Sequence, residues 1–277
     1  MWEICTHGPV KIIVGEVIMK LENKVALVTG SSSGIGKGIA IGFAKEGANV
    51  VVNYHSRKNL AEETVNIVKN LGRRAIAIQA DVAKIDDVTG LIDGAWAMLG
   101  KIDILVNNAG ISPEVPFLKV SEKTWDRVLA VNLKGAFLCS QAVARKMVEN
   151  KISGKIINVS SVNGFQVEPG RAHYNVSKGG LDMLTASMAV ELGPYNINVN
   201  GLAPGVITGT DIVPEGFMED PQFNEAVLSK TPLGRLGTVE DCVGAAVFLA
   251  SDDSKYIQGH TIIIDGGLSI QQYRRIE

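Results

Sequence analysis

The chain alternates between short apolar runs and longer segments in which apolar residues recur at helical spacing. Seven runs are predicted as strands, and most of them are near-continuously apolar and rich in Val and Ile, which is typical of strands buried on both faces of a parallel sheet. These predicted strands are Val25–Thr29, Val50–Asn53, Ala75–Ala80, Ile104–Asn107, Lys155–Val159, Ile197–Leu202 and Thr261–Ile264. Helical spacing predicts helices over 35–46, 58–71, 84–99, 121–149, 173–192 and 238–251.

Regular alternation of strand and helix favours right-handed crossovers between parallel strands. We therefore expect an α/β fold, a single doubly wound (Rossmann) domain with an about seven-stranded parallel sheet and helices on both faces. The domain is expected over residues 19–277. Residues 1–18 form an extension without an assigned role. Their apolar run is broken by Lys11 and Glu16 and lacks a small-residue cleavage site, so a signal peptide is not predicted.

Residues 203–236 interrupt this regularity with four prolines and four glycines, and a short helix is predicted at 221–229. The segment follows the sixth predicted strand. Ligands bind beyond the carboxyl ends of strands in open α/β sheets. We therefore expect about 206–236 to be a lid that covers a substrate.

Composition narrows the range of partners. The net charge of the 277-residue chain is −2, and its basic residues form no run, so neither nucleic acid nor an anionic membrane surface is expected as a partner. No apolar stretch reaches the roughly 18 residues of a membrane span. The histidines share no ligand spacing, so no metal site is predicted. The three cysteines lie far apart and form no CxxC pair, which indicates reduced thiols in the cytoplasm; they are Cys5, Cys139 and Cys242.

A glycine-rich turn, Thr29-Gly30-Ser31-Ser32-Ser33-Gly34-Ile35-Gly36, joins the first predicted strand to the first helix. Its glycines permit a tight turn, close approach of backbone to a pyrophosphate, and close packing of helix on strand. The helix N-terminus offers free N–H groups to phosphates. The turn also matches the hydrolase pattern G-x-S-x-G, but that fold places several strands before its nucleophile, and almost nothing precedes this one. A dinucleotide site is therefore favoured.

The end of the second predicted strand bears on cofactor choice. No Asp or Glu lies between Gly47 and Glu62, where an NAD-selective site usually holds the ribose 2′-hydroxyl. Instead, His55, Arg57 and Lys58 could neutralise a 2′-phosphate. The alternative, that Arg57 and Lys58 are only the solvated start of a helix, stays open. We expect NADP or dual use of NADP and NAD.

Tyr174 and Lys178 are four residues apart, so on a helix they share one face. A nearby ammonium group lowers the pKa of a tyrosine and makes it a usable acid or base. Ser161 ends the fifth predicted strand, where its hydroxyl could hold a carbonyl oxygen. Asn132 lies within a predicted helix although Asn is a mediocre helix former, which suggests a functional role.

These motifs together resemble the short-chain dehydrogenase/reductase family over roughly residues 20–267. In family order they are T-G-x-x-x-G-x-G at 29–36, Asp81-Val82, N-N-A-G at 107–110, Asn132, Ser161, Y-x-x-x-K at 174–178 and Pro204-Gly205.

The resemblance implies a catalytic set of Asn132, Ser161, Tyr174 and Lys178. Tyr174 is implied as the acid/base, Lys178 as the group that lowers its pKa and binds the nicotinamide ribose, Ser161 as the group that orients the substrate oxygen, and Asn132 as support for a water relay. Asp81 and Val82 would contact adenine. The implied cofactor-binding residues are Gly30, Ser32, Ser33, Gly34, Ile35, Gly36, Tyr54, His55, Ser56, Asp81, Val82, Asn108, Ala109, Gly110, Tyr174, Lys178, Pro204, Gly205 and Ile207.

Two positions depart from the family pattern. Gly209 stands where the family often has a carboxamide-binding Thr, which leaves Thr208 or Thr210 as its replacement. Ser33 stands where many NADP-preferring members carry a basic residue.

By this resemblance the protein is an NAD(P)-dependent oxidoreductase that transfers a hydride between nicotinamide and a carbonyl or secondary alcohol. The sequence looks similar to glucose 1-dehydrogenases and to 3-oxoacyl-carrier-protein reductases. Scattered basic residues such as Lys230 and Arg235 form no docking patch for a carrier protein, which favours a sugar, polyol or small ketone. A non-catalytic NADP-sensing protein is the alternative from another class. The resemblance also implies a homotetramer, with a dimer as the fallback.

Overall fold

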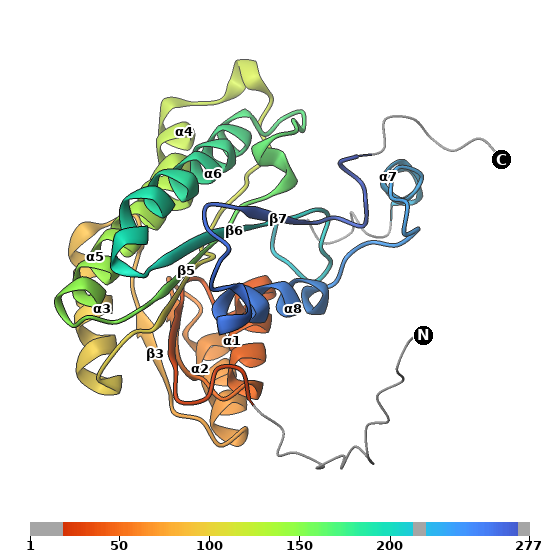
Figure 1. Ribbon diagram of the computed structural model, residues 1–277. Helices are drawn as coiled ribbons and strands as arrows, with labels where there is room; N and C mark the ends of the chain where they lie inside the picture. Colours follow the sequence, from red (N-terminus) through yellow and green to blue (C-terminus); the bar gives the residue numbers. More distant parts are fainter. Residues whose placement is uncertain (1–18, 213–219, 271–277) are drawn as a thin grey trace, which may run out of the picture.

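The computed structural model describes residues 19–212 and 220–270. The extension predicted at 1–18, part of the predicted lid and Cys5 therefore lie outside the described residues. The described chain forms one seven-stranded, fully parallel sheet in the order β3-β2-β1-β4-β5-β6-β7 (Figure 1). Its strands are β1 (Val25–Val28), β2 (Asn49–Tyr54), β3 (Ala75–Gln79), β4 (Ile104–Asn107), β5 (Lys155–Val159), β6 (Asn198–Pro204) and β7 (Thr261–Ile264).

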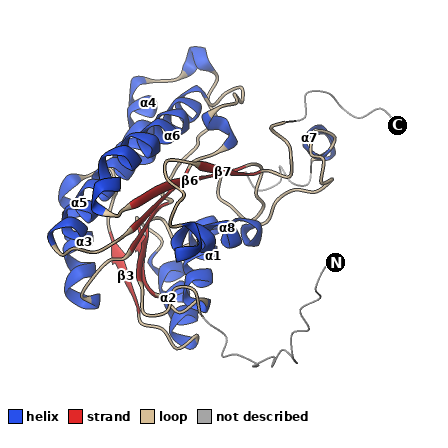
Figure 2. Ribbon diagram, viewed as in Figure 1, coloured by secondary structure: helices blue, strands red, loops and turns tan. Residues whose placement is uncertain are grey.

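Helices cover both faces of this sheet (Figure 2). On one face lie α1 (Gly34–Lys45), α2 (Lys58–Asn70) and α8 (Val239–Ala250). On the other lie α3 (Ile85–Leu99), α5 (Gly135–Glu149) and α6 (Ala172–Leu192), with α4 (Glu122–Leu129) leading into α5. The predicted doubly wound fold and its seven strands are confirmed.

Two apolar cores follow from the alternation of side chains along each strand. In β1, Ala26 and Val28 face the first core with Phe43 of α1, whereas Val25 and Leu27 face the second. Phe43 is fully buried. Burial of such a side chain contributes about 1.5–3 kcal/mol. These two cores explain why the strands read as continuous apolar runs.

The structure differs from the sequence-based expectation in the helix predicted over 121–149. Between α4 and α5 the chain makes a wide π-helical turn at Ala130–Lys134, in which the N–H of Gly135 donates to the carbonyl of Ala130. Asn132 lies inside this turn. Its side chain makes hydrogen bonds to the loop after β4 and to Ser177 of α6, which accounts for an asparagine at this position of the helix. A π-turn inside a helix is frequently found at a functional site.

The predicted short helix is present as α7 (Pro221–Leu228), which begins with a proline and is capped by Asp220. The sixth strand runs to Pro204, two residues beyond the predicted end, because Pro204 pairs in register with Ile264 of β7. None of the described helices is both long and apolar enough to cross a membrane.

The order in which strands are added to the sheet reverses at β1. From β1 the chain adds β2 and β3 on one side, and then returns to add β4 on the other side of β1. At this point the backbone N–H groups of Asn108 and Ala109 donate to the Thr29 hydroxyl at 3.0 and 3.1 Å. These contacts hold the loop after β4 against the loop after β1. The crevice beyond such a strand pair is where an open α/β sheet binds ligands.

Candidate active site

Tyr174 and Lys178 lie one turn apart on α6 and are both almost completely buried. The Lys178 Nζ donates a 2.7 Å hydrogen bond to the carbonyl of Val159, the last residue of β5. The same Nζ lies 5.5 Å from the centre of the Tyr174 ring. The spacing recognised in the sequence therefore brings a phenol and an ammonium group together at the end of the sheet.

Two adjacent serines after β5 point to different partners. The Ser160 hydroxyl donates to the Lys178 carbonyl at 3.3 Å, which ties β5 to α6. The Ser161 side chain accepts from the N–H of Asn163 and lies close enough to the Tyr174 phenol to lower its pKa. Of the two, Ser161 is the serine placed beside the phenol, where a substrate oxygen could contact both hydroxyls.

Burial controls the ionisation of the pair. It raises the pKa of Tyr174 to about 12, against the lowering effect of the hydrogen bond with Ser161. It also lowers the pKa of Lys178 to about 8, against the raising effect of Asp182. The pKa of Tyr174 thus moves in the opposite direction to the sequence-based expectation, because desolvation of the phenolate outweighs the lowering effects of Ser161 and of the Arg171 charge.

Asn132 is buried beneath this pair. Its amide oxygen accepts from the N–H of Ile111 at 2.9 Å, and its amide nitrogen donates to the Ile111 carbonyl at 2.9 Å and to the Ser177 hydroxyl at 3.0 Å. The Ser177 hydroxyl in turn donates to the Tyr174 carbonyl at 2.7 Å. Asn132 therefore joins the loop after β4 to the helix that carries Tyr174.

A cavity of about 520 Å³ opens in front of Tyr174, Lys178 and Ser161. One wall is polar and comes from the loop between β5 and α6. There, Arg171 is buried, donates to the Ser112 carbonyl and hydroxyl at 2.9 and 2.6 Å, and pairs with Glu168 at 2.9 Å. The wall opposite is largely apolar; it includes Val206, Ile207, Ile212, Ala226, Val227 and Leu268.

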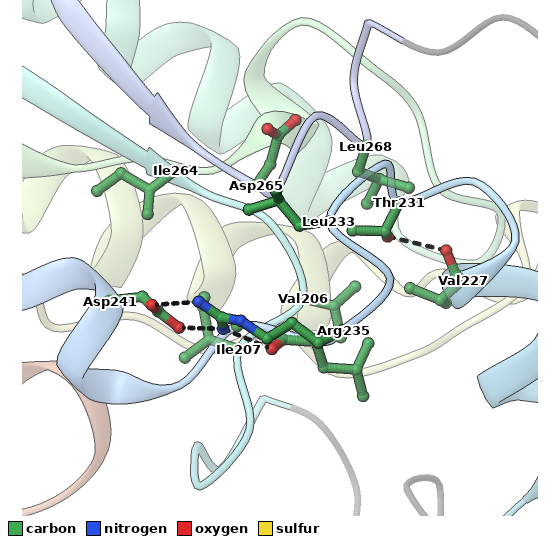
Figure 3. A pocket seen from close by; sticks show the side chains of 13 residues that line it. Val206, Ile207, Val227, Thr231, Leu233, Arg235, Asp241, Ile264, Asp265 and Leu268 are labelled. Atoms are coloured by element: carbon green, nitrogen blue, oxygen red, sulfur yellow. Dashed lines mark hydrogen bonds and ion pairs between the residues drawn. The ribbon is translucent and has the colours of Figure 1, made fainter.

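The outgoing and returning segments of the predicted lid lie side by side next to the ends of β6 and β7 (Figure 3). Ile207 pairs with Gly237 as an isolated bridge between the outgoing and returning chain. Arg235 makes a two-pronged ion pair with Asp241 at the start of α8, at 2.7 and 2.8 Å. A small pocket of about 80 Å³ lies between these contacts and the ends of β6 and β7. It is too small for a sugar and contains none of the predicted catalytic residues.

The glycine-rich turn lines a second cavity, of about 300 Å³, beyond β1 and β2. Gly30 has φ of +61°, and a Cβ there would lie 2.9 Å from the Ala109 Cα. Ser33 is the N-cap of α1, but its side chain makes no hydrogen bond with that helix. The first N–H groups of α1 therefore remain available to phosphate oxygens. This donor set fits the pyrophosphate of a nicotinamide dinucleotide.

Charged groups surround the outer end of this second cavity. Asp81 accepts from Arg127 at 2.9 Å and lies 3.8 Å from His55. Burial alone would raise the pKa of Asp81, but hydrogen bonds from Arg127 and the N–H of Ala83 bring it below its usual value. Asp81 is therefore a carboxylate that is held ionised at the position predicted to contact adenine.

Arg57 and Ser33 share a single acidic partner. The guanidinium of Arg57 donates to both oxygens of Asp211 at 2.9 and 2.5 Å, and the Ser33 hydroxyl donates to the same carboxylate at 3.0 Å. Asp211 belongs to the predicted lid. The three residues line the same cavity as the glycine-rich turn.

The structure brings most of the predicted cofactor residues to one or other cavity, but two lie elsewhere. Tyr54 is buried in the first apolar core. Gly36 packs against the turn and does not line either cavity. A Cβ on Gly36 would lie 2.7 Å from the carbonyl oxygen of Gly30. Of the two candidate threonines, Thr210 lines both cavities and donates to the Ile207 carbonyl at 3.0 Å, whereas Thr208 does not line them.

Sequence reasoning did not single out Arg127, Arg171 or Asp211. The contact between Arg127 and Asp81 joins residues 46 apart, and that between Arg57 and Asp211 joins residues 154 apart. Neither pattern has a local signal. Arg171 could have been noticed only through its place three residues before Tyr174.

Known proteins match the chain over most of its length. The family model described as Enoyl-(Acyl carrier protein) reductase matches residues 30–269. Glucose 1-dehydrogenase 2 of Bacillus subtilis is 39% identical over 251 residues, which are 90% of this chain and 96% of that protein. A 3-oxoacyl-acyl-carrier-protein reductase of Staphylococcus epidermidis is 42% identical over 246 residues, 89% of this chain and 99% of that protein.

Among solved structures, gluconate 5-dehydrogenase from Burkholderia cenocepacia J2315, in complex with NADP and tartrate, superposes with a TM-score of 0.86 at 38% identity. The match covers 91% of this chain and 98% of that one. The chain belongs to the short-chain dehydrogenase/reductase family. It is an NAD(P)-dependent oxidoreductase that acts on alcohol and carbonyl groups.

Proposed function

We propose that the protein interconverts a secondary alcohol and a carbonyl on a small, hydroxyl-rich substrate, a sugar or polyol, with small ketones as the next class. The observation that carries this proposal is the polar wall facing Tyr174. Buried Arg171 holds the carboxylate of Glu168 at the cavity, and Asn163 donates to the same carboxylate at 3.1 Å. A fixed carboxylate and an amide are good partners for sugar hydroxyls.

Hydride transfer is the chemistry that a bound nicotinamide supplies. The chain provides the proton and the orientation. In reduction, the substrate oxygen is held by the hydroxyls of Ser161 and Tyr174, and the Tyr174 O–H is transferred to the developing alkoxide. A phenol whose pKa is near 12 keeps its proton until the alkoxide forms, which suits this acid role. Lys178 then returns a proton to the tyrosine. In this mechanism Asn132 positions the helix turn that carries both residues.

We propose NADP as the preferred cofactor, with NAD as a slower substitute. The segment that follows β2 carries no Asp or Glu before Glu62, and its residues His55, Ser56 and Arg57 line the cavity. The solved gluconate 5-dehydrogenase contains NADP, which agrees with this assignment. Thr210 is the threonine proposed to contact the carboxamide, because it lies at the junction of the two cavities.

A second candidate is reduction of a 3-oxoacyl group on a carrier protein. It is favoured by the 42% identity to the staphylococcal reductase and by Lys230, an exposed cation on the rim of the main cavity. A phosphopantetheine arm could reach the cavity past this lysine. We rank it second because Glu168 and Asn163 place polar groups beside Tyr174, although the largely apolar wall opposite them would accept an acyl chain.

We also propose a homotetramer located in the cytoplasm. The outer faces of α5 and α6 expose apolar side chains, among them Phe137, Met183 and Val190, and Ile263 is exposed on the edge strand β7. Two separate apolar surfaces are what a tetramer with two kinds of interface needs. Cys139 and Cys242 are buried free thiols, which is typical of a reducing compartment.

The test is a substrate panel followed at the absorbance of the reduced nicotinamide. Glucose, gluconate, other polyols, small ketones and an acetoacetyl thioester are each run with NADP(H) and NAD(H). We expect turnover of a polyol or sugar acid with NADP(H). Replacement of Tyr174 by Phe should reduce kcat by about 100- to 10,000-fold, the range for loss of a general acid.

Binding of NADPH to Tyr174→Phe serves as the control, since the variant should bind within a few-fold of wild type. Turnover confined to the thioester would replace the sugar proposal with the carrier-protein one. Tight NADPH binding without turnover of any compound would favour a sensing protein. Full activity of Tyr174→Phe would refute the proposed mechanism.

A further inference from the structure

Asp211 places a carboxylate inside the cavity predicted to hold the adenosine end of the cofactor. It accepts both prongs of the Arg57 guanidinium and the Ser33 hydroxyl. Arg57 follows β2, Ser33 precedes α1 and Asp211 follows β6, so three separate segments converge on these two oxygens. The side chains of Arg57 and Asp211 are 47% and 60% exposed, which leaves the carboxylate accessible to exchange with a ligand.

The donors that hold Asp211 are those that a phosphate monoester requires. A guanidinium binds carboxylate and phosphate in the same forked geometry, and a serine hydroxyl adds a third donor to either anion. Nearby cations already have other acidic partners. Lys58 pairs with Glu62 at 3.6 Å, Lys37 pairs with Glu63 at 3.8 Å, and Arg127 pairs with Asp81. Arg57 differs from these three cations, because its acidic partner, Asp211, belongs to the predicted lid.

We propose that Asp211 is a specificity-determining residue, which competes with the 2′-phosphate of NADP for Arg57 and Ser33. This inference rests on the proposed NADP site. The 2′-phosphate of NADP has to displace the Asp211 carboxylate before it can bind Arg57 and Ser33, and this displacement weakens NADP binding. NAD has a neutral 2′-hydroxyl and leaves the pair of Arg57 and Asp211 intact. Asp211 thus reduces the preference for NADP and accounts for a site that accepts both cofactors.

The rival interpretation is that the ion pair only fastens the lid. In that case, removing the carboxylate would alter the binding of NADP and NAD by the same factor, or leave both unchanged. The chain offers a matched control for this interpretation. Arg235 and Asp241 form a comparably exposed, two-pronged pair at the other end of the lid, and neither lines the cavity of the glycine-rich turn.

The experiment measures dissociation constants of NADPH and NADH by nucleotide fluorescence with the full-length protein. The variants are Asp211→Asn, Arg57→Gln, the double variant and the control Arg235→Gln. We expect Asp211→Asn to tighten NADPH binding about two- to fivefold, as befits an exposed ion pair, and to change NADH binding less than twofold. In the Arg57→Gln background the same change should have a clearly smaller effect on NADPH binding, because only the Ser33 hydroxyl is then contested. Arg235→Gln should not discriminate between the cofactors.

Equal changes for the two nucleotides, or weaker NADPH binding by Asp211→Asn, would overturn the inference. If the underlying NADP assignment is wrong, the result is different: Arg57→Gln and the wild type would then bind NADPH with the same dissociation constant. If Arg57→Gln weakens NADPH binding while Asp211→Asn changes nothing, the NADP site stands and only the competition by Asp211 is refuted.

Discussion

The side-chain amide of Asn132 donates a 3.0 Å hydrogen bond to the hydroxyl of Ser177, one residue before Lys178. The remaining two hydrogen bonds of that amide go to the backbone of Ile111. A single buried side chain therefore fixes the position of α6 relative to the loop after β4. This relationship makes Asn132 a structural support of the site as well as a predicted catalytic residue.

Replacement of Asn132 by Ala should destabilise the protein and impair catalysis together. The buried hydroxyl of Ser177 and the partly buried N–H and carbonyl of Ile111 would lose their partner, and a buried group left unsatisfied costs about 1–3 kcal/mol. Urea unfolding measures the loss. Asn150→Ala is the control, because Asn150 is exposed and bonds only to its own helix, so a change within about 0.5 kcal/mol is expected. Equal stability of the two variants would contradict the support role.

The rate of alcohol oxidation should rise with pH and level off above about pH 8. Burial lowers the pKa of Lys178 to about 8, so above this pH the lysine is neutral and can take the O–H proton of Tyr174 as the phenol oxygen accepts the proton of the alcohol. Carbonyl reduction should show the reverse trend, because it needs the protonated lysine. Profiles of kcat/KM between pH 6 and 10, in both directions, test this. A flat oxidation profile through pH 8 would show that Lys178 does not titrate in the working range.

Replacement by alanine should lower the free energy of unfolding at one glycine, Gly205, and raise it at another, Gly244. A Cβ at Gly205 would lie 2.8 Å from the Cβ of Asp265 and 3.0 Å from its Cα, so Gly205→Ala should destabilise the fold by about 1–3 kcal/mol. Gly244 lies on the exposed side of α8 with nothing within 4 Å of its Cβ position. Gly244→Ala should therefore stabilise by about 0.5–1 kcal/mol. Urea midpoints that shift in the same direction would contradict this assignment.

Replacement of Met183 by Asp should split the proposed tetramer. Met183 is 69% exposed on α6, beside the exposed Phe137 of α5, and an ionised carboxylate cannot be buried there without a partner. Sedimentation or light scattering would report a smaller particle. Met98→Asp is the matched control, since Met98 is 55% exposed on α3 and should leave the mass unchanged. A wild-type monomer would refute the assembly itself.

The parts of the protein that could be predicted are those encoded by local periodicity. An apolar run predicts the strand that precedes Ser161. Helical spacing of apolar residues predicts the helix of Tyr174 and Lys178, and their separation of four residues places them on one face of it. Gly30 and Gly34 made the turn predictable, because glycine is the residue that adopts positive φ without strain. Their φ values are +61° and +55°.

The parts that escaped prediction depend on contacts between distant segments. Asp211 reaches Arg57 across 154 residues, and no pattern near either residue signals the pair. The π-turn at Ala130–Lys134 was also missed, because a wide turn leaves helical spacing recognisable on each side of it. The raised pKa of Tyr174 depends on how completely the fold buries the ring, which spacing does not reveal.

That π-turn joins two halves of one helical rod. Arg127, on the near half, reaches Asp81 at the adenine end of the crevice, whereas Asn132, in the turn itself, reaches Ser177 at the proton-transfer end. The turn holds one residue more than a regular α-helical turn, so the N–H of Gly135 donates to the carbonyl of Ala130 instead of that of Val131. A single rod thus contacts both ends of the crevice, and its extra residue lies where the second contact is made.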